Sequence, residues 1–105
     1  MHVIKYSDAA HLNYQVDAFD AMISEFCPDR WSNGDAYGNF PTEYEIDKEQ
    51  FINMISKIKG MTQEEFDTYD FGFDPEVTVE YLVGALEDLL EEADPNLDII
   101  YLTWF

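Results

Sequence analysis

The sequence predicts an α+β fold: a small three-stranded sheet with about four helices, in the order β-α-β-α-α-α-β, forming a single acidic domain over residues 1–105. Three observations predict it. Short segments rich in β-forming residues lie near both ends and near the middle of the chain. Between them, apolar residues recur at three- and four-residue steps, as they do on amphipathic helices. The apolar fraction of 47% is too high for a disordered acidic chain, and 105 residues suffice for one core.

The first strand is expected at His2–Tyr6, followed by a helix that Ser7 or Asp8 caps and that ends before Pro28. The apolar face of this helix consists of Leu12, Val16, Phe19, Ile23 and Phe26. From Pro28 to Pro41 the chain is rich in Gly, Pro, Asn and Asp, which is typical of a loop. This loop contains the aromatic residues Trp31, Tyr37 and Phe40. So long a connection either packs through its own aromatic side chains or serves as a contact surface.

The middle of the chain predicts a second strand and two helices. Thr42–Ile46 alternates between polar and apolar residues, as in a strand with one exposed face. Asp47 caps the next helix, which ends near Gly60 and has one apolar stripe of Phe51, Ile55 and Ile58. Thr62 and Glu65 have the spacing of a capping box, so a short helix runs from Gln63 to about Tyr69. The segment 70–74 then ends it.

The fourth helix is expected from Pro75 to about Ala93, with Asp74 as its cap and proline at its first position. Its apolar residues fall within about 120° of arc; they are Val79, Leu82, Val83, Leu86, Leu89, Leu90 and Ala93. The apolar run at residues 97–105 reads as a buried strand. Helices on one face of the sheet would bury all of these apolar stripes.

The charge of the chain is strongly one-sided. The net charge is −18, the last basic residue is Lys59, and residues 61–105 carry 13 carboxylates. Each pair of neighbouring carboxylates costs roughly 0.3 kcal/mol in salt, so a dozen cost about 3–4 of a typical stability of about 5–15 kcal/mol. Part of this charge serves solubility. It excludes nucleic acid and anionic membranes as direct partners, because no basic patch is present.

The fourth helix concentrates the acidic residues on its outer side. Glu76, Glu80, Glu87 and Glu91 fall within about 60°, and Asp88 and Glu92 widen this stripe. Glu76 and Glu80 would lie about 6 Å apart along the axis, while DNA has a phosphate about every 3.4 Å per strand. The stripe therefore predicts that this helix imitates the row of phosphates along a DNA strand. The ordinary alternative is a solvated helix face, but such faces mix both signs of charge.

Further residues are expected to extend the binding surface. The acids nearest in sequence are Glu64, Glu65, Asp67 and Asp70. Trp31 and Tyr37 are candidate aromatic anchors for a partner protein, because Trp and Tyr are enriched in interfaces. Packing of their loop against the core is the alternative. The partner that this surface predicts is a basic protein surface.

Motifs for catalysis or metal binding are lacking. His2 and His11 are the only histidines, and neither belongs to a nucleophile motif. Cys27 is the only cysteine and falls within an apolar segment, so a small buried hydrophobe is the simplest interpretation. Residues 29–34 resemble part of an EF-hand loop, but Trp31 occupies a ligand position and Phe40 replaces the bidentate Glu. We expect no enzyme activity, no cofactor and no metal.

The N-terminus resembles one family. The chain begins with Met1-His2-Val3-Ile4-Lys5-Tyr6, and after three residues continues with Ala10-His11-Leu12-Asn13-Tyr14. This opening resembles that of a small phage-encoded type I-F anti-CRISPR protein that binds the backbone subunit of the surveillance complex. The resemblance covers about 14 of the 105 residues. It implies a partner-binding role for Tyr6. Asp20 and Trp31 stand where the family has a tyrosine and a glutamate, so those two roles do not carry over.

Together, acidity and resemblance predict a phage-encoded anti-CRISPR inhibitor of a type I surveillance complex (Cascade), working in the host bacterial cytoplasm. It would act as an acidic DNA mimic that blocks binding of target DNA at the large or the backbone Cas subunit. The alternative is an antirestriction DNA mimic or an immunity protein that covers a basic nuclease, because charge alone does not separate these partners. The N-terminus lacks the pattern of a signal peptide, and no apolar run reaches the length of a membrane span.

Overall fold

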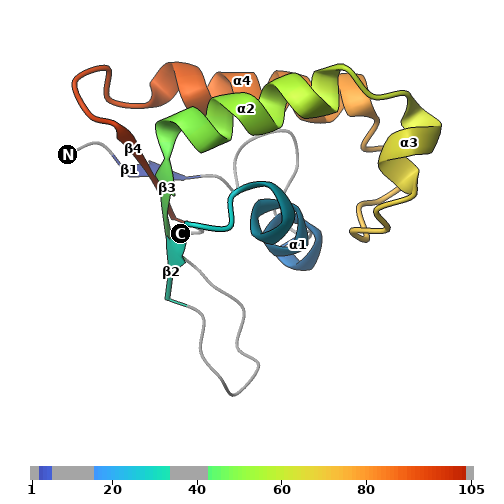
Figure 1. Cartoon of the computed structure of the whole chain (residues 1–105), viewed down its shortest axis with the longest axis horizontal. Coiled ribbons are helices and arrows are strands. Elements are labelled where there is room, and N and C mark those ends of the chain that lie inside the picture. Colours follow the sequence, from blue (N-terminus) through green and yellow to red (C-terminus); the bar gives the residue numbers. More distant parts are fainter. Residues whose placement is uncertain (1–2, 6–15, 34–42, 104–105) are drawn as a thin grey trace.

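The computed structural model describes residues 3–5, 16–33 and 43–103 of the chain. They form the predicted α+β fold, with four helices and a small sheet (Figure 1). The elements in chain order are β1 (Val3–Lys5), α1 (Val16–Phe26), β2 (Trp31–Ser32), β3 (Glu43–Asp47), α2 (Lys48–Lys59), α3 (Gln63–Asp67), α4 (Val79–Glu92) and β4 (Ile99–Thr103). The one element that the sequence did not predict is β2, a two-residue strand within the segment interpreted as a loop.

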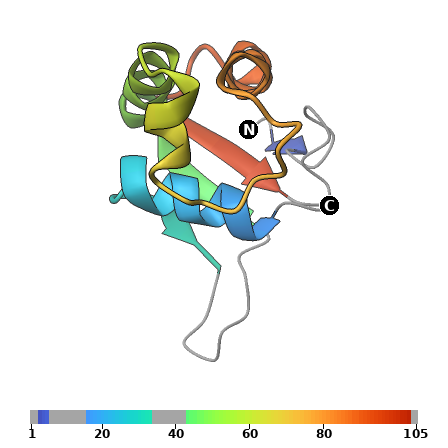
Figure 2. The ribbon, with the colours of Figure 1, turned by 90° about the vertical axis from the view of Figure 1, so that its right-hand side faces the viewer.

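The sheet has the strand order β1-β4-β3-β2. β4 pairs in parallel with β1, where Val3 lies opposite Tyr101, and antiparallel with β3, where Tyr44 lies opposite Leu102. Figures 1 and 2 show the four helices on one side of this sheet, with α2 and α4 lying side by side. The other side of the sheet is covered by no helix of the described segments.

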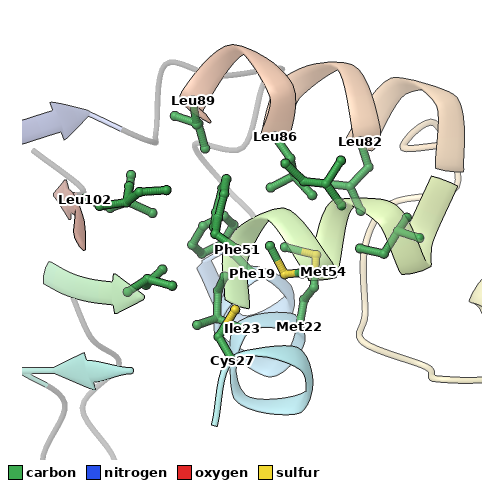
Figure 3. Close-up of a cluster of buried hydrophobic side chains, with 14 of the residues drawn as sticks. Phe19, Met22, Ile23, Cys27, Phe51, Met54, Leu82, Leu86, Leu89 and Leu102 are labelled. Carbon is green, nitrogen blue, oxygen red and sulfur yellow. The ribbon is translucent and has the colours of Figure 1, made fainter. Parts of the chain in front are cut away.

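The core lies between the sheet and the helices. Phe19, Met22 and Ile23 of α1 meet side chains of α2 and α4 there (Figure 3). β3 and β4 alternate, so that Tyr44 and Leu102 are buried while their neighbours along each strand are not. The buried Tyr44 hydroxyl donates a hydrogen bond to Asp20 Oδ1 at 2.9 Å, and satisfying this buried polar group ties β3 to α1. The long segment expected as a fully buried strand is thus an alternating strand of five residues.

Local capping signals determine where α2 and α3 begin. The Asp47 carboxylate accepts from the backbone N–H groups of Glu49 and Gln50, as expected for an N-cap. The predicted capping box is present: Thr62 Oγ1 accepts from the Glu65 N–H, and Glu65 Oε1 accepts from the Thr62 N–H. The expected cap at Ser7 or Asp8 lies outside the described residues.

The predicted start of α4 is wrong by four residues. Asp74 and Pro75 form a turn, closed by the Val77 N–H donating to the Asp74 carbonyl at 2.9 Å. Val77 is buried, and the helix is capped by Thr78, whose Oγ1 accepts from the Tyr81 N–H at 3.1 Å. A tertiary contact reinforces this start, because Gln63 Oε1 accepts the Val79 N–H at 2.8 Å.

Residues 68–78, which we call the strap, connect α3 to α4 and pass across α1 (Figure 2). Their aromatic side chains join a cluster with Phe26 at the end of α1: its ring centroid lies 5.4 Å from that of Tyr69 and 5.9 Å from that of Phe71. The strap bends sharply at Asp70 (φ 52°) and Gly72 (φ 100°). A non-glycine residue in the left-handed region is uncommon, and Asp is among the residues that tolerate it. The strap is therefore packed on α1 through its aromatic side chains.

Candidate functional site

The outer side of α4 carries five exposed carboxylates: Glu80, Glu87, Asp88, Glu91 and Glu92. We call this surface the acidic face. The opposite side of the same helix is buried against the core through Leu82, Leu86 and Leu89 (Figure 3). Within the described part of the chain, these five carboxylates form no hydrogen bond or ion pair with another group. The acids thus point to solvent rather than to internal partners, as the sequence predicted.

Glu76 does not belong to this helix. Because α4 is capped at Thr78, Glu76 lies in the strap, and the expected 6 Å helical spacing between Glu76 and Glu80 is wrong. Its side chain is nevertheless exposed. The strap therefore continues the acidic surface from α4 toward α3 without the regular spacing of a helix.

The acids of α3 and the strap are exposed as well, but two of them also serve the local structure. Glu65 completes the capping box of α3, and Asp67 Oδ1 accepts a hydrogen bond from Gln63 Nε2 at 3.0 Å. Glu64 and Asp70 make no such side-chain hydrogen bond within the described residues. Of the four acids near α3, these two are the ones available to a partner without a structural cost.

Gly84 lies in the middle of the acidic face and leaves a hollow there. Two open grooves meet at it: one of about 720 Å³, bordered by Glu80 and Glu87, and one of about 580 Å³, bordered by Tyr81 and Asp88. A Cβ atom at Gly84 would have no neighbour within 4 Å, so close packing does not require glycine at this position. No pattern in the sequence singles out this residue.

A cation borders the acidic face. Lys59, at the end of α2, lines the same groove as Glu80 and Glu87. The sequence has no basic residue after position 59, but α2 lies beside α4. The acids of α4 are therefore closer to a positive charge in space than their distance along the sequence indicates. The remaining acids of α4, toward its C-terminal end, lie farther along the helix from Lys59.

The predicted aromatic anchors do not join the acidic face. Trp31 is 51% exposed, but it lies in β2, opposite Glu45 of β3. Glu45 in turn lies opposite Tyr101 of β4. Cross-strand partners share a face of the sheet, and buried Tyr44 and Leu102 occupy the helix-covered face. Trp31 is thus on the uncovered face of the sheet, and Figure 1 shows its strand, β2, apart from α4. Tyr6 and Tyr37 lie outside the described residues.

Cys27 has the environment of an inert core residue. It is fully buried, and burial raises the pKa of its thiol to about 12, although the nearby Arg30 charge lowers this pKa in part. A neutral thiol is a poor nucleophile. In the ranges 16–33 and 43–103, no three His, Cys, Asp or Glu side chains converge to hold a metal ion. No helix of the described ranges is long and apolar enough to cross a membrane.

Compared with protein-family models, with curated proteins and with solved structures, the chain gives no significant match to any of them.

Proposed function

We propose that this protein is a non-enzymatic inhibitor that presents the acidic face of α4 to a basic, DNA-binding surface of a type I CRISPR–Cas surveillance complex. Binding would occupy the Lys and Arg side chains that otherwise hold target DNA. The large subunit, which recognises the DNA motif next to the target, is the preferred partner, and the backbone subunit is the other candidate.

The observation that carries this proposal is the division of α4 into two faces. One face is buried in the core, while the other exposes five carboxylates and no cation of its own. Like charges on neighbouring turns destabilise a helix, so this arrangement has a stability cost that a mixed surface would avoid. A cationic partner offsets that cost and is drawn to the acidic face by long-range attraction.

The short resemblance of residues 1–14 to an anti-CRISPR protein favours a Cas complex over other basic partners. A restriction enzyme or a basic nuclease offers a similar electrostatic target. These partners therefore remain the alternative, and the same experiment has to include them.

The test is an electrophoretic shift assay in which purified type I surveillance complexes meet target DNA with and without this protein. We expect the protein to prevent formation of the DNA complex in a dose-dependent manner. The E80K/E87K/E91K variant reverses three exposed charges of the acidic face and should weaken inhibition by about tenfold or more. The matched control E25K/E43K/E49K changes the net charge equally at exposed positions outside α4 and should inhibit almost as well as the wild type.

Equal loss of inhibition in both variants would show that net charge, and not the acidic face, is responsible. Unchanged DNA binding with every type I complex, together with capture of a restriction enzyme or basic nuclease by the immobilised protein, would replace the Cas complex with that partner. Circular dichroism of both variants verifies that the fold is retained, because all six side chains are exposed.

A further inference from the structure

A cavity of about 370 Å³ lies between α3, the strap and the start of α4. This volume is near the lower end for small-molecule sites, so it has room for one side chain rather than for a large ligand. The cavity is more enclosed than the two grooves along α4. It is therefore a defined pocket beside the acidic face.

Three phenylalanine rings line this pocket: Phe66, Phe71 and Phe73. The Phe66 and Phe73 rings are nearly parallel, with an interplanar angle of 27° and centroids 6.2 Å apart. Phe71 is steeply inclined to both, at 64° to Phe66 and 84° to Phe73. Phe66 is buried in the core, and the other two rings are only partly buried. The pocket thus has an aromatic lining, and aromatic rings attract a cation placed over their faces.

Three aspartates also line the pocket: Asp67, Asp70 and Asp74. The chain bends sharply between Asp67 and Asp74, at Asp70, which has a left-handed conformation, and at Gly72. Among the described residues that line this pocket, none is Lys, Arg or His. The described carboxylates do not converge as a metal ion requires.

We infer that this pocket binds an arginine side chain of the basic partner, with the guanidinium over the phenylalanine rings and its N–H groups donating to the Asp70 carboxylate. Arginine fits better than lysine because a planar guanidinium both stacks on aromatic rings and donates in pairs to carboxylates. The inference rests on the proposed function for the basic nature of the partner. It adds a specific anchor to an otherwise diffuse electrostatic surface.

The experiment is a titration followed by nuclear magnetic resonance, using the full chain and three peptides that differ at one side chain. The probes are acetyl-Gly-Arg-Gly-amide, the lysine peptide and the citrulline peptide, which has nearly the shape of arginine without its charge. We expect saturable shifts of the Phe66, Phe71 and Phe73 ring signals with the arginine peptide, at a Kd on the order of millimolar. The lysine peptide should bind at least about threefold more weakly, and the citrulline peptide should not saturate.

Asp70→Asn is the informative variant, because asparagine tolerates the left-handed conformation and only the charge is lost. We expect it to weaken arginine binding about threefold or more. Asp98→Asn removes the same charge from an exposed position directly before β4, which Figure 1 shows far from α3, and should leave binding unchanged. Phe73→Leu keeps an apolar side chain but removes one aromatic wall, and should also weaken binding.

Equal binding of the citrulline or the lysine peptide, equal effects of Asp70→Asn and Asp98→Asn, or shifts confined to α4 would each overturn the inference. The titration contains no Cas protein, so its outcome is independent of the shift assay. Saturable binding of arginine without inhibition of a Cas complex would refute the proposed partner and retain the pocket. Inhibition of a Cas complex without arginine binding would refute the pocket and retain the proposed partner.

Discussion

α2 and α4 lie side by side and bury similar side chains, but their exposed sides differ. α2 contributes Phe51, Met54, Ile55 and Ile58 to the core, and α4 contributes Leu82, Val83, Leu86 and Leu89. Outside, α2 carries three lysines and one glutamate, whereas α4 carries five carboxylates and no cation. The last turn of α2 contains Lys57 and Lys59, which suit the negative end of the helix dipole, whereas the last turn of α4 contains acids. The buried faces of the two helices are therefore alike, and the difference between the helices lies in the charge of their outer faces.

The largest losses of stability should be similar in the two helices, because they come from substitutions on the buried faces. Phe51→Ala in α2 should lower the free energy of unfolding by about 3–5 kcal/mol, and Leu86→Ala in α4 by about 2–5 kcal/mol. Both side chains are fully buried. Urea denaturation measures these changes. A loss below about 1 kcal/mol at only one of the two sites would mean that the helices do not share one core.

Charge reversal at the C-terminal ends of the two helices should change the free energy of unfolding in opposite directions. E91K/E92K in α4 should raise the free energy of unfolding by about 1–2 kcal/mol, because the lysines suit the helix dipole and relieve repulsion. K57E/K59E in α2 should lower it by a similar amount. Thermal denaturation at low salt measures both changes, and a few hundred millimolar salt should reduce them. The same sign in both variants would contradict the comparison.

The smallest effect concerns helix propensity in the middle of each helix. Gly84→Ala should stabilise the protein by about 0.8–1 kcal/mol, because the added Cβ has open space and alanine favours the helix. The counterpart is Ser56→Ala, at an exposed position of α2, with a gain of about 0.5 kcal/mol or less. Urea denaturation compares the two. If Gly84→Ala also weakens inhibition in the shift assay, the hollow at Gly84 contributes to partner binding, and an unchanged inhibition curve would show that it does not.

Features that depend on neighbours in sequence were predictable. The caps at Asp47 and Thr62, and the buried stripe of α2, follow from spacings of three or four residues. The exposure of the carboxylates on α4 follows in the same way from the helical period. For these elements, local sequence and tertiary packing require the same conformation.

Features that depend on distant contacts were not predictable. Asp74 and Thr78 are both good helix caps, and the choice of Thr78 comes from the burial of Val77 and from the hydrogen bond between Gln63 and Val79. β2 exists only because Trp31 and Ser32 meet β3. Likewise, the position of Lys59 beside the acidic face and the pocket under the strap arise from packing between elements, which a local pattern does not encode.

The central position of β4 has a consequence for how the molecule opens. Val3 pairs with Tyr101, so nearly the whole chain lies in the loop that this contact closes. The helices α2 to α4, in contrast, follow one another directly along the chain. Large loops close slowly, so β1 should be the last strand to join and, with only three residues, the first to leave. Its departure would bare one edge of β4, and a bare strand edge readily pairs with another chain. Conditions that release β1 should therefore be those under which two copies of this protein associate.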